Sequence, residues 1–505
     1  MLEKINMMKQ RTQNTLKAYR FFGKPILLFS AIYLIALSAL LRANFYYIDD
    51  LGRAAFGYVQ WEVYARYLSV FFSHIIHADS YLTDVSPLPQ MIAVLVMAIA
   101  STMTIYIIGG GKKEYSLWMI AAALPLGLNP YFLECFSYKY DSPYMAMSVL
   151  ASVFPLIFWK SKTWKFILAS IVGTLCMCMT YQVSAGIYPM LVVIVCIRMW
   201  VENEDIKDIL RMALISAASF LAGLLIFNRL VMPFIQEEFA QTYSTNFEAI
   251  NTLISHAMDT YKKYTKLFLS DFKSEWLILI GILCLGFLYA VISGTKQHRV
   301  ITALLVLPAL IGLFALSFGV YPVLGQPSFF PRCMYGIGAF LAFLGVFILS
   351  VKPNNLPVKL TCLALSWMFF SFAFTYGNAL DAQSEWTDFR IEQVAEDLAE
   401  WDGISTEGMK SVRVTGTIGF TPVMRRMPQD YQILNRLVPV HFSDSQGWWG
   451  PFKLLHYYGF TNLEHNGTDD FSQLDLPVIV DNAYHTIRAD EEHIWIDLHD
   501  PFSNA

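Results

Sequence analysis

Long apolar runs recur through the first three quarters of this chain, and they constrain its fold more than any other feature. Many of them reach the roughly 17 to 25 residues that a helix needs to cross a bilayer. The chain of 505 residues is 55% hydrophobic and only 15% charged, whereas about a quarter of an average soluble domain is charged. The sequence therefore predicts a polytopic α-helical membrane protein.

We expect about eleven membrane-spanning helices from the lengths of these runs. The expected ranges are 25–42, 88–108, 117–134, 143–159, 166–182, 184–200, 212–232, 274–293, 300–320, 333–351 and 359–376. A basic leader, residues 1–24, precedes the first run, which continues to Leu41 without a small-residue cleavage site. This pattern indicates a retained anchor rather than a cleaved signal peptide.

Lysine and arginine gather in alternate connections between the expected spans. Besides the leader, basic residues occur around 112–113, 160–165, 198–211, 296–299 and 352–359. With eleven spans all of these lie on one side, which the positive-inside rule identifies as the cytoplasm. The outer side would then receive residues 43–87, 132–142, 233–273, 321–332 and everything after 376.

The first outer loop, residues 43–87, contains a helical pattern over 61–76. Its apolar residues include Trp61, Tyr64, Leu68, Phe71 or Phe72, and Ile75, while Glu62, Arg66, Ser69 and Ser73 occupy the other face. Such an amphipathic helix is suited to lying in the plane of the membrane interface. A buried helix of an outer domain is the alternative.

The last part of the chain, residues 377–505, has a different composition and predicts a small α/β domain on the outer side. The segment 382–400 is amphipathic and acidic, and 411–420, 476–480 and 493–497 have the character of short strands. A Gly/Trp-rich loop in this part contains Trp448 and Trp449. An exposed tryptophan pair could stack on sugar rings, and packing in an aromatic core is at least as good an explanation.

Adjacent carboxylates, Asp49 and Asp50, directly follow the first apolar run. A charged side chain at the edge of a membrane is energetically costly unless it is hydrated or paired, and such residues often have a function. The pair could cap a turn or helix, or it could supply a general base or metal ligand, with Asp50 narrowly favoured as the base. Arg53 could hold one of the two carboxylates ionised if the segment is helical.

Further charges lie at the outer ends of the expected spans. The segment after Asn129 contains Glu134, Tyr138, Lys139 and Asp141. These charges could extend to the interface, with a local Lys139–Asp141 pair, or they could line a polar pocket between spans.

Arg332 opens the tenth expected span from the outer side, where the positive-inside rule disfavours arginine. Its guanidinium suits a phosphate, either of a substrate or of an ordinary lipid headgroup. Tyr181 and Gln182, at the outer end of the fifth expected span, add polar lining.

Several other functions find no support in the sequence. The Gly109–Lys113 loop lacks the Ser/Thr of a phosphate-binding P-loop, and there is no HExxH, no GxSxG and no nucleotide fingerprint. The seven cysteines include no CxxC motif and none follows residue 362, so we expect neither a disulfide in the polar tail nor a zinc site. Nothing indicates nucleic-acid binding.

Taken together, several motifs resemble a known family. They are Tyr47–Arg53 (YIDDLGR), Gly57-Tyr58 with Trp61, Ser86–Gln90 (SPLPQ), Leu128–Ser142 (LNPYFLECFSYKYDS) and the turn at Arg332. Between residues 40 and 335 the chain resembles the serotype-converting O-antigen glucosyltransferases of phages and bacteria. It departs from the expected Gly-Arg-Pro-like turn at Ala65-Arg66-Tyr67.

The resemblance implies a GT-C-type glycosyltransferase in the bacterial inner membrane, with the N-terminus cytoplasmic and the C-terminal domain periplasmic. The implied donor is undecaprenyl phosphate–glucose and the implied acceptor is lipid-linked O-antigen. A flippase and a polyprenyl-phosphate glucosyl synthase would be functional partners, and membrane lipids would surround the catalytic part, 25–376.

The expected mechanism is a single displacement with inversion at the anomeric carbon. Asp49 or Asp50 would act as base, Arg332 would stabilise the leaving phosphate, and Lys139 is the second candidate for that task. No cofactor is required, although Asp49 and Asp50 could hold a divalent metal such as Mg²⁺ or Mn²⁺. A lipid-linked sugar flippase or transporter and a surface-polysaccharide polymerase or ligase are the competing interpretations.

Overall fold

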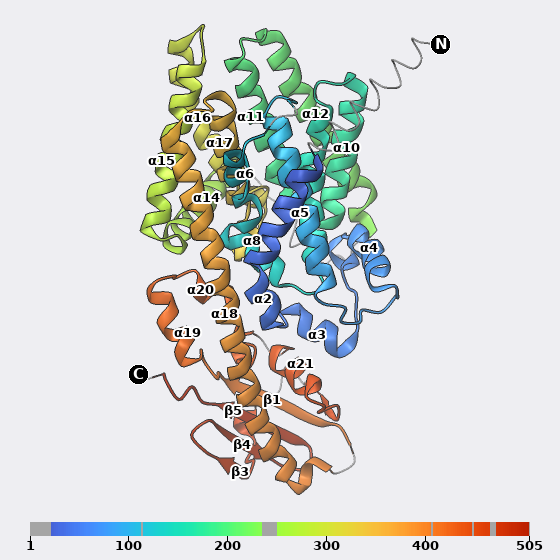
Figure 1. Cartoon of the computed structure of the whole chain (residues 1–505). Coiled ribbons are helices and arrows are strands. Elements are labelled where there is room, and N and C mark those ends of the chain that lie inside the picture. The colour runs from blue at the N-terminus through green and yellow to red at the C-terminus, as the bar shows by residue number, and fades with distance from the viewer. Residues whose placement is uncertain are drawn as a thin grey trace, which may run out of the picture.

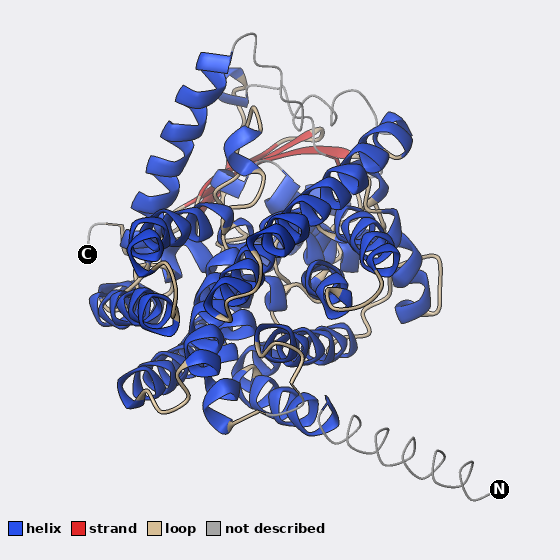
Figure 2. Ribbon diagram, turned by 90° about the horizontal axis from the view of Figure 1, so that it is seen from above, coloured by secondary structure: helices blue, strands red, loops and turns tan. Residues whose placement is uncertain are grey.

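The computed structural model describes residues 22–112, 115–234, 250–405, 408–446, 449–464 and 471–503. Most of the leader, up to residue 21, lies outside the described residues. A bundle of helices forms the upper body of the molecule, and a sheet lies at its lower end (Figure 1). The view from above shows the helices packed side by side, with the strands beneath them (Figure 2).

The first half of the bundle is built from helices of very different length. An apolar helix, Phe22–Ala36, comes first. The following helices are α2 (Ser38–Ala43), α3 (Asp49–Phe56), α4 (Tyr67–His77), α5 (Leu88–Ile108), α6 (Leu117–Ala123), α7 (Pro125–Leu128), α8 (Pro130–Ser137), α9 (Ser142–Val153), α10 (Thr163–Thr180), α11 (Ile187–Val201) and α12 (Ile206–Leu230). The short helices cluster around the outer loop and the junction after α5.

The second half of the chain contains longer helices and the sheet. Its helices are α14 (Ile250–Asp271), α15 (Ser274–Gly294), α16 (Arg299–Leu316), α17 (Gly336–Val351), α18 (Leu356–Glu400), α19 (Pro422–Arg426), α20 (Leu434–Leu437) and α21 (Trp449–Tyr457). Its strands are β1 (Lys410–Gly416), β2 (Leu463–Glu464), β3 (Val478–Asp481), β4 (His485–Ala489) and β5 (His493–Leu498).

Within the described residues, seven helices are long and apolar enough to cross a membrane, or eight with one bent pair. These seven helices correspond to seven of the expected spans, namely 88–108, 166–182, 184–200, 212–232, 274–293, 300–320 and 359–376. Three of the remaining expected ranges coincide with shorter apolar helices, Phe22–Ala36, Ser142–Phe158 and Gly336–Val351. The chain is therefore a polytopic helical membrane protein, and the count of eleven spans stays a prediction.

The bent pair explains how a polar site can form next to the apolar bundle. Leu117–Leu128 and Pro130–Ser137 meet at an angle of 57°. Pro130 cannot donate a backbone hydrogen bond and restricts the residue before it. Asn129 accordingly has an extended conformation, and its side chain accepts a hydrogen bond from the N–H of Phe132, which caps α8. The chain therefore changes direction where α8 begins.

Several helices present apolar side chains on the outside of the molecule. Leu214 and Leu225 of α12 are 69% and 61% exposed, and Leu285 of α15 and Leu304 of α16 are 68% and 70% exposed. Apolar surface of this extent is rare on a soluble monomer. The outward faces of these helices are therefore suited to contact with lipid.

Helix α18 connects the bundle to the sheet without a break. Its 45 residues correspond to about 68 Å of helix, roughly twice the thickness of the hydrocarbon core. The domain boundary expected at 376/377 therefore falls inside a continuous helix. The acidic segment 382–400 is helical as expected, and Ile391, Val394 and Leu398 pack in the same core as the sheet.

The sheet has five strands in the order β2-β1-β5-β4-β3. Strand β1 is parallel to β2 and β5, whereas β4 is antiparallel to β3 and β5. The three expected strands are present with shifted ends: β1 stops at Gly416, whose φ of 73° is left-handed. Strands β2 and β4 were not expected from the sequence.

Candidate active site

The turn before α3 holds its backbone in a strained conformation. Ile48, a β-branched residue, has φ 47° and ψ −90°, which such a residue rarely adopts. Asp49 and Asp50 follow as the first two residues of α3. Their negative charges therefore lie at the positive end of the helix dipole.

Asp50 is a buried structural carboxylate. One of its oxygens accepts hydrogen bonds from the N–H groups of Tyr47 and Lys139, at 3.1 and 2.8 Å, and the other accepts one from the N–H of Tyr140 at 3.4 Å. Burial raises the pKa of Asp50, and a nearby carboxylate, Asp141, adds to the shift while these backbone donors oppose it. The residue joins α3 to the turn after α8.

Asp49 is the accessible member of the pair. Its side chain is partly exposed and has no hydrogen bond or ion pair within the parts of the chain that the structure describes. The narrow preference for Asp50 as the base is therefore not supported by the geometry, because Asp50 is fully buried and has both oxygens engaged. Asp49 is the better candidate.

Arg53 does not pair with either of these residues, as the sequence had suggested it could. Its guanidinium lies 3.2 Å from the carboxylate of Asp141 and 4.0 Å from the ring centre of Trp61. The indole N–H of Trp61 also donates to Asp141. Helix α3 presents Arg53 to the junction after α8, so tertiary contact rather than helical spacing chooses its partner.

Lys139 lies in a closed environment. Its side chain is 1% exposed, its Nζ is 3.4 Å from a carboxylate oxygen of Asp84, and it lies 3.5 Å from the ring centre of Tyr46. The hydroxyl of Tyr46 donates to the same Asp84 at 2.8 Å. Burial lowers the pKa of Lys139, and Asp84 opposes this shift. Lys139 therefore does not form the local pair with Asp141, and it is not placed to contact a phosphate.

Arg332 and Glu134 form an ion pair at the end of α8. The Nη1 of Arg332 lies 2.8 Å from the carboxylate of Glu134, which also accepts the backbone N–H of Arg332. Glu134 is 1% exposed, whereas 19% of the Arg332 side chain is exposed. The other guanidinium nitrogens of Arg332 have no hydrogen bond within the described residues. They remain available to an anion.

Tyr138 packs between Tyr47 and Arg332. Its ring contacts Tyr47 at 4.9 Å between ring centres, and the guanidinium of Arg332 lies 5.5 Å from its ring centre. Burial raises the pKa of Tyr138, Arg332 opposes the shift, and Glu134 and Asp49 add to it. The charges of Asp49 and Arg332 therefore both act on this one side chain.

Arg66, Tyr181 and Gln182 form a second group beside this site. The Nε of Arg66 donates to the amide oxygen of Gln182 at 3.1 Å, and the guanidinium lies 4.6 Å from the ring centre of Tyr181. Ala65 has a left-handed φ of 59°, and Tyr67 is the first residue of α4. These are positions that favour glycine and proline, so the turn is kept although Ala65 and Tyr67 replace the expected residues.

The expected amphipathic helix is shorter than predicted. The left-handed turn at Ala65 separates a short 3₁₀ helix, η1 (Glu62–Tyr64), from α4, so 61–76 is not one helix. Ser69 and Ser73 are buried against the protein, whereas Phe71 and Ile75 are 57% and 60% exposed. The apolar face of α4 points outward, which fits an interfacial helix better than a helix buried in an outer domain.

Lys453 was not anticipated from the sequence. It lies in α21, and its Nζ is 2.8 Å from the hydroxyl of Tyr58. A Cβ atom on Gly52 would lie 2.5 Å from the Cε of Lys453, so this lysine packs directly on α3. Burial lowers the pKa of Lys453, and Asp49 opposes the shift. The only sequence signal was a single lysine within a largely apolar segment.

The side chains of the tryptophan pair, Trp448 and Trp449, lie outside the part of the chain that the structure describes. Trp448 lies outside the described residues, and Trp449 begins α21 with its side chain also outside them. Metal ligation by Asp49 and Asp50 is not favoured, because Asp50 accepts backbone hydrogen bonds with both oxygens. In the described part of the chain, no group of three or more His, Cys, Asp or Glu residues could hold a metal ion.

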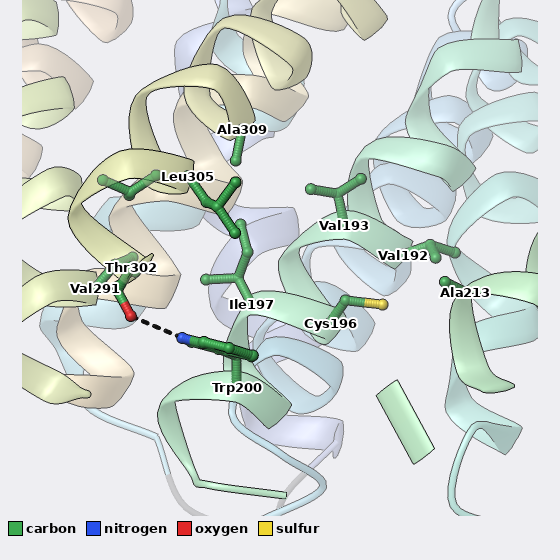
Figure 3. A pocket seen from close by; sticks show the side chains of 11 residues that line it. Val192, Val193, Cys196, Ile197, Trp200, Ala213, Val291, Thr302, Leu305 and Ala309 are labelled. Atoms are coloured by element: carbon green, nitrogen blue, oxygen red, sulfur yellow. Dashed lines mark hydrogen bonds between the residues drawn. The ribbon is translucent and has the colours of Figure 1, made fainter. Parts of the chain in front are cut away.

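An apolar pocket of about 280 Å³ lies elsewhere, between α11, α12, α15 and α16. Figure 3 shows its lining, which includes Val193, Ile197 and Leu305, and the hydrogen bond of 2.9 Å from the indole of Trp200 to Thr302. It contains no ionisable acid or base apart from the thiol of Cys196. This pocket is therefore not a site for sugar transfer.

Comparison with known proteins identifies the family of this chain. The family model for the glucosyl transferase GtrII matches residues 38–352, which is more than half of the chain. A Salmonella phage P22 protein, described as an uncharacterized 55.3 kDa protein in the gtrB 5' region, is 25% identical over 441 residues, covering 84% of this chain and 88% of the relative. No solved structure matches. The family expected from the motifs is confirmed, and the chain belongs to the GtrII glucosyl transferases.

Proposed function

We propose that this glycosyltransferase moves glucose from undecaprenyl phosphate–glucose to lipid-linked O-antigen at the periplasmic face of the bacterial inner membrane. The family supports glucosyl transfer. The P22 relative is described by its position next to gtrB, which is consistent with a role in modifying phage-related surface carbohydrate. In this proposal the fold is of the GT-C type, with the N-terminus in the cytoplasm.

The arrangement of Asp49, Tyr138 and Arg332 carries the proposal. A partly exposed carboxylate with no protein partner in the described residues and a partly exposed guanidinium act on one tyrosine ring. A transfer from a phosphate-linked sugar needs a base at the acceptor and a positive charge at the leaving group. The two groups lie at the ends of apolar helices, where a lipid-linked donor would present its headgroup.

The reaction is a single displacement. The acceptor hydroxyl oxygen attacks the anomeric carbon as Asp49 takes the hydroxyl proton, and a new glycosidic bond forms with inversion. The bond from the anomeric carbon to the phosphate oxygen breaks, and undecaprenyl phosphate leaves with the electron pair. Arg332 stabilises the charge that develops on this phosphate.

Two further charged groups organise the site in this proposal. Lys453 contacts α3 at Gly52, and Asp49 opposes the lowering of the pKa of Lys453 by burial. Glu134 fixes one edge of Arg332 and leaves the other edge for the donor. The C-terminal part, 377–505, brings Lys453 to the site and would hold the polysaccharide acceptor.

A transfer assay tests the function directly. Purified protein is supplied with undecaprenyl phosphate–glucose and lipid-linked O-antigen, and glucose on the acceptor is measured by mass spectrometry. The expected result is addition of single glucose residues. Movement of the lipid-linked sugar across a vesicle membrane without a new glycosidic bond would instead indicate a flippase, and transfer of preassembled glycans would indicate a polymerase or ligase.

A further inference from the structure

A second pocket, of about 290 Å³, lies beside the candidate active site. It is enclosed by η1, α12 and two 3₁₀ helices, η3 (Gln182–Gly186) and η5 (Tyr321–Val323). Most of its lining is apolar and includes Leu224, Phe227, Met232, Val320, Val323 and Leu324. The volume is near the lower end of the range for small-ligand pockets, about 300 Å³, so it can hold part of a long chain but not all of it.

One end of this pocket is positively charged. Arg66 and Gln182 lie there, joined by the 3.1 Å hydrogen bond from the arginine Nε, and Gln182 in turn donates to the carbonyl of Tyr64 at 2.9 Å. No carboxylate forms an ion pair with Arg66 in the described parts of the chain. An uncompensated guanidinium at the end of an apolar pocket fits an amphiphile with an anionic head.

The charged end faces the candidate active site. The guanidinium of Arg66 lies over the ring of Tyr181, 4.6 Å from the ring centre. Tyr181 also stacks on Tyr335, with 6.4 Å between ring centres. The hydroxyl of Tyr321, which lines the pocket, donates to the sulfur of Cys333 at 3.1 Å, and Cys333 follows Arg332 in the chain. The apolar pocket therefore has Arg66 at one end and borders the segment that carries Arg332. A lipid-phosphate sugar likewise has an apolar chain joined to a phosphate.

The charged end of the pocket lies beside helix α4. Ser69 of α4 donates to the carbonyl of Thr180, next to Tyr181, at 3.2 Å. This bond fixes α4, whose exposed Phe71 and Ile75 suit the membrane interface, beside the charged end of the pocket. A headgroup at Arg66 would thus lie near the interface, with its chain directed into apolar surroundings.

We propose that this pocket binds the first isoprenoid units of the donor lipid and that Arg66 contacts a phosphate oxygen on the lipid side while Arg332 contacts the phosphate on the sugar side. The assignment rests on the proposed function, because it identifies the anionic amphiphile as a polyprenyl phosphate. Arg66 is then a donor-binding residue, distinct from the base and from Arg332.

Binding of radiolabelled farnesyl phosphate to the purified full chain in detergent tests the site without requiring catalysis. Leu224→Trp fills the pocket and should weaken binding at least tenfold. Leu225→Trp is the matched control, since Leu225 is 61% exposed and does not line the pocket, and it should change binding less than twofold. Val323→Trp, on the opposite wall, should repeat the effect if Leu224→Trp does not fold.

The charge is tested with Arg66→Gln and Arg66→Lys. Arg66→Gln should weaken binding of farnesyl phosphate at least tenfold but leave binding of uncharged farnesol unchanged, and Arg66→Lys should restore part of the affinity. The same variants should raise KM for undecaprenyl phosphate–glucose more than they lower kcat. Equal binding by wild type, Leu224→Trp and Arg66→Gln would overturn the proposal and indicate nonspecific partitioning.

The two proposals fail in different ways. If the wild type transfers glucose and the pocket variants keep normal donor KM and farnesyl phosphate affinity, the lipid site is wrong and the function stands. If farnesyl phosphate binding depends on Leu224 and Arg66 but no glucose is transferred, the proposed function is wrong and the site binds a lipid phosphate for another purpose.

Discussion

The backbone N–H of Lys139 donates a hydrogen bond of 2.8 Å to the carboxylate of Asp50. This bond connects the start of α3 to the turn after α8, and the N–H of Tyr47 donates to the same oxygen. Asp49 is the partly exposed member of the acidic pair, whereas Asp50 is buried. This contact gives Asp50 a structural role, and in the proposed mechanism the chemical role belongs to its neighbour Asp49.

Asp49→Asn and Asp50→Asn should therefore behave differently. Asp49→Asn should keep the melting temperature and lose about 10²- to 10⁴-fold in transfer rate, the usual contribution of a general base. Asp50→Asn keeps an acceptor oxygen for the two shorter hydrogen bonds and should retain most activity. The measurements are the initial rate of glucose transfer and thermal unfolding in detergent.

Asp50→Ala is the control for the structural role. It leaves the buried N–H groups of Tyr47 and Lys139 without an acceptor, at a cost of about 1–3 kcal/mol each, so melting should fall clearly. A stable but inactive Asp50→Asn, together with an active Asp49→Asn, would reverse the assignment. Full activity of both would show that neither is the base.

The Arg332–Glu134 pair should separate stability from catalysis. Arg332→Gln leaves the buried carboxylate of Glu134 without its cation, and breaking a buried pair in this way typically costs about 3–5 kcal/mol. The double variant Arg332→Gln/Glu134→Gln removes both charges and should recover most of the lost stability. Its donor KM should nevertheless stay at least tenfold raised, and recovery of a normal KM would remove the phosphate-binding role of Arg332.

Replacement of Gly52 by alanine should lower the rate of glucose transfer, because the new side chain would displace Lys453. The Cβ of Gly52→Ala would lie 2.5 Å from the Cε and 2.6 Å from the Nζ of Lys453, so the lysine must move away from Asp49. We expect the rate of glucose transfer to fall about tenfold, because a positive charge is displaced from the site.

Lys453→Met removes the charge altogether and should lower the rate of glucose transfer by a similar factor. Gly312→Ala is the matched glycine control, because nothing lies within 4 Å of a Cβ at that position of α16. Its activity should equal that of the wild type, and its stability should be unchanged or slightly higher. If Gly52→Ala lowers the rate and Lys453→Met does not, Gly52 matters for the packing of α3 rather than for the position of the lysine charge.

His441 should make the protein less stable in mild acid. Burial lowers the pKa of His441 to about 4, although its hydrogen bond to the carbonyl of Tyr46 opposes the shift. The unfolded chain, with a histidine pKa of 6.5, binds the proton more readily than the folded protein, so stability falls as the pH drops from 6.5 towards 4. At pH 5 the loss is about 2 kcal/mol.

His441→Gln keeps a side-chain N–H for the carbonyl of Tyr46 and removes the titration. Between pH 7 and pH 5 its melting temperature should therefore fall less than that of the wild type. Equal falls for both proteins would assign the acid sensitivity to other buried groups, such as His77 and His485, whose pKa values burial also lowers.

The sequence by itself determined the membrane character of the chain, the position of most of its long helices and its family. These properties are local: a run of apolar residues predicts a helix because each turn must satisfy its own backbone in lipid. It also placed Asp49, Arg332 and Glu134 near the edges of apolar runs, since these edges are visible in the residue order.

Only the tertiary structure decided what each charged group does. Asp49 and Asp50 are neighbours in the chain, yet contact with Lys139 buries one and leaves the other accessible. Arg53 pairs with Asp141 instead of the acidic pair, and Lys453 reaches α3 from about 400 residues away. Electrostatic roles depend on distance in space and on burial, and neither can be read from spacing along the chain.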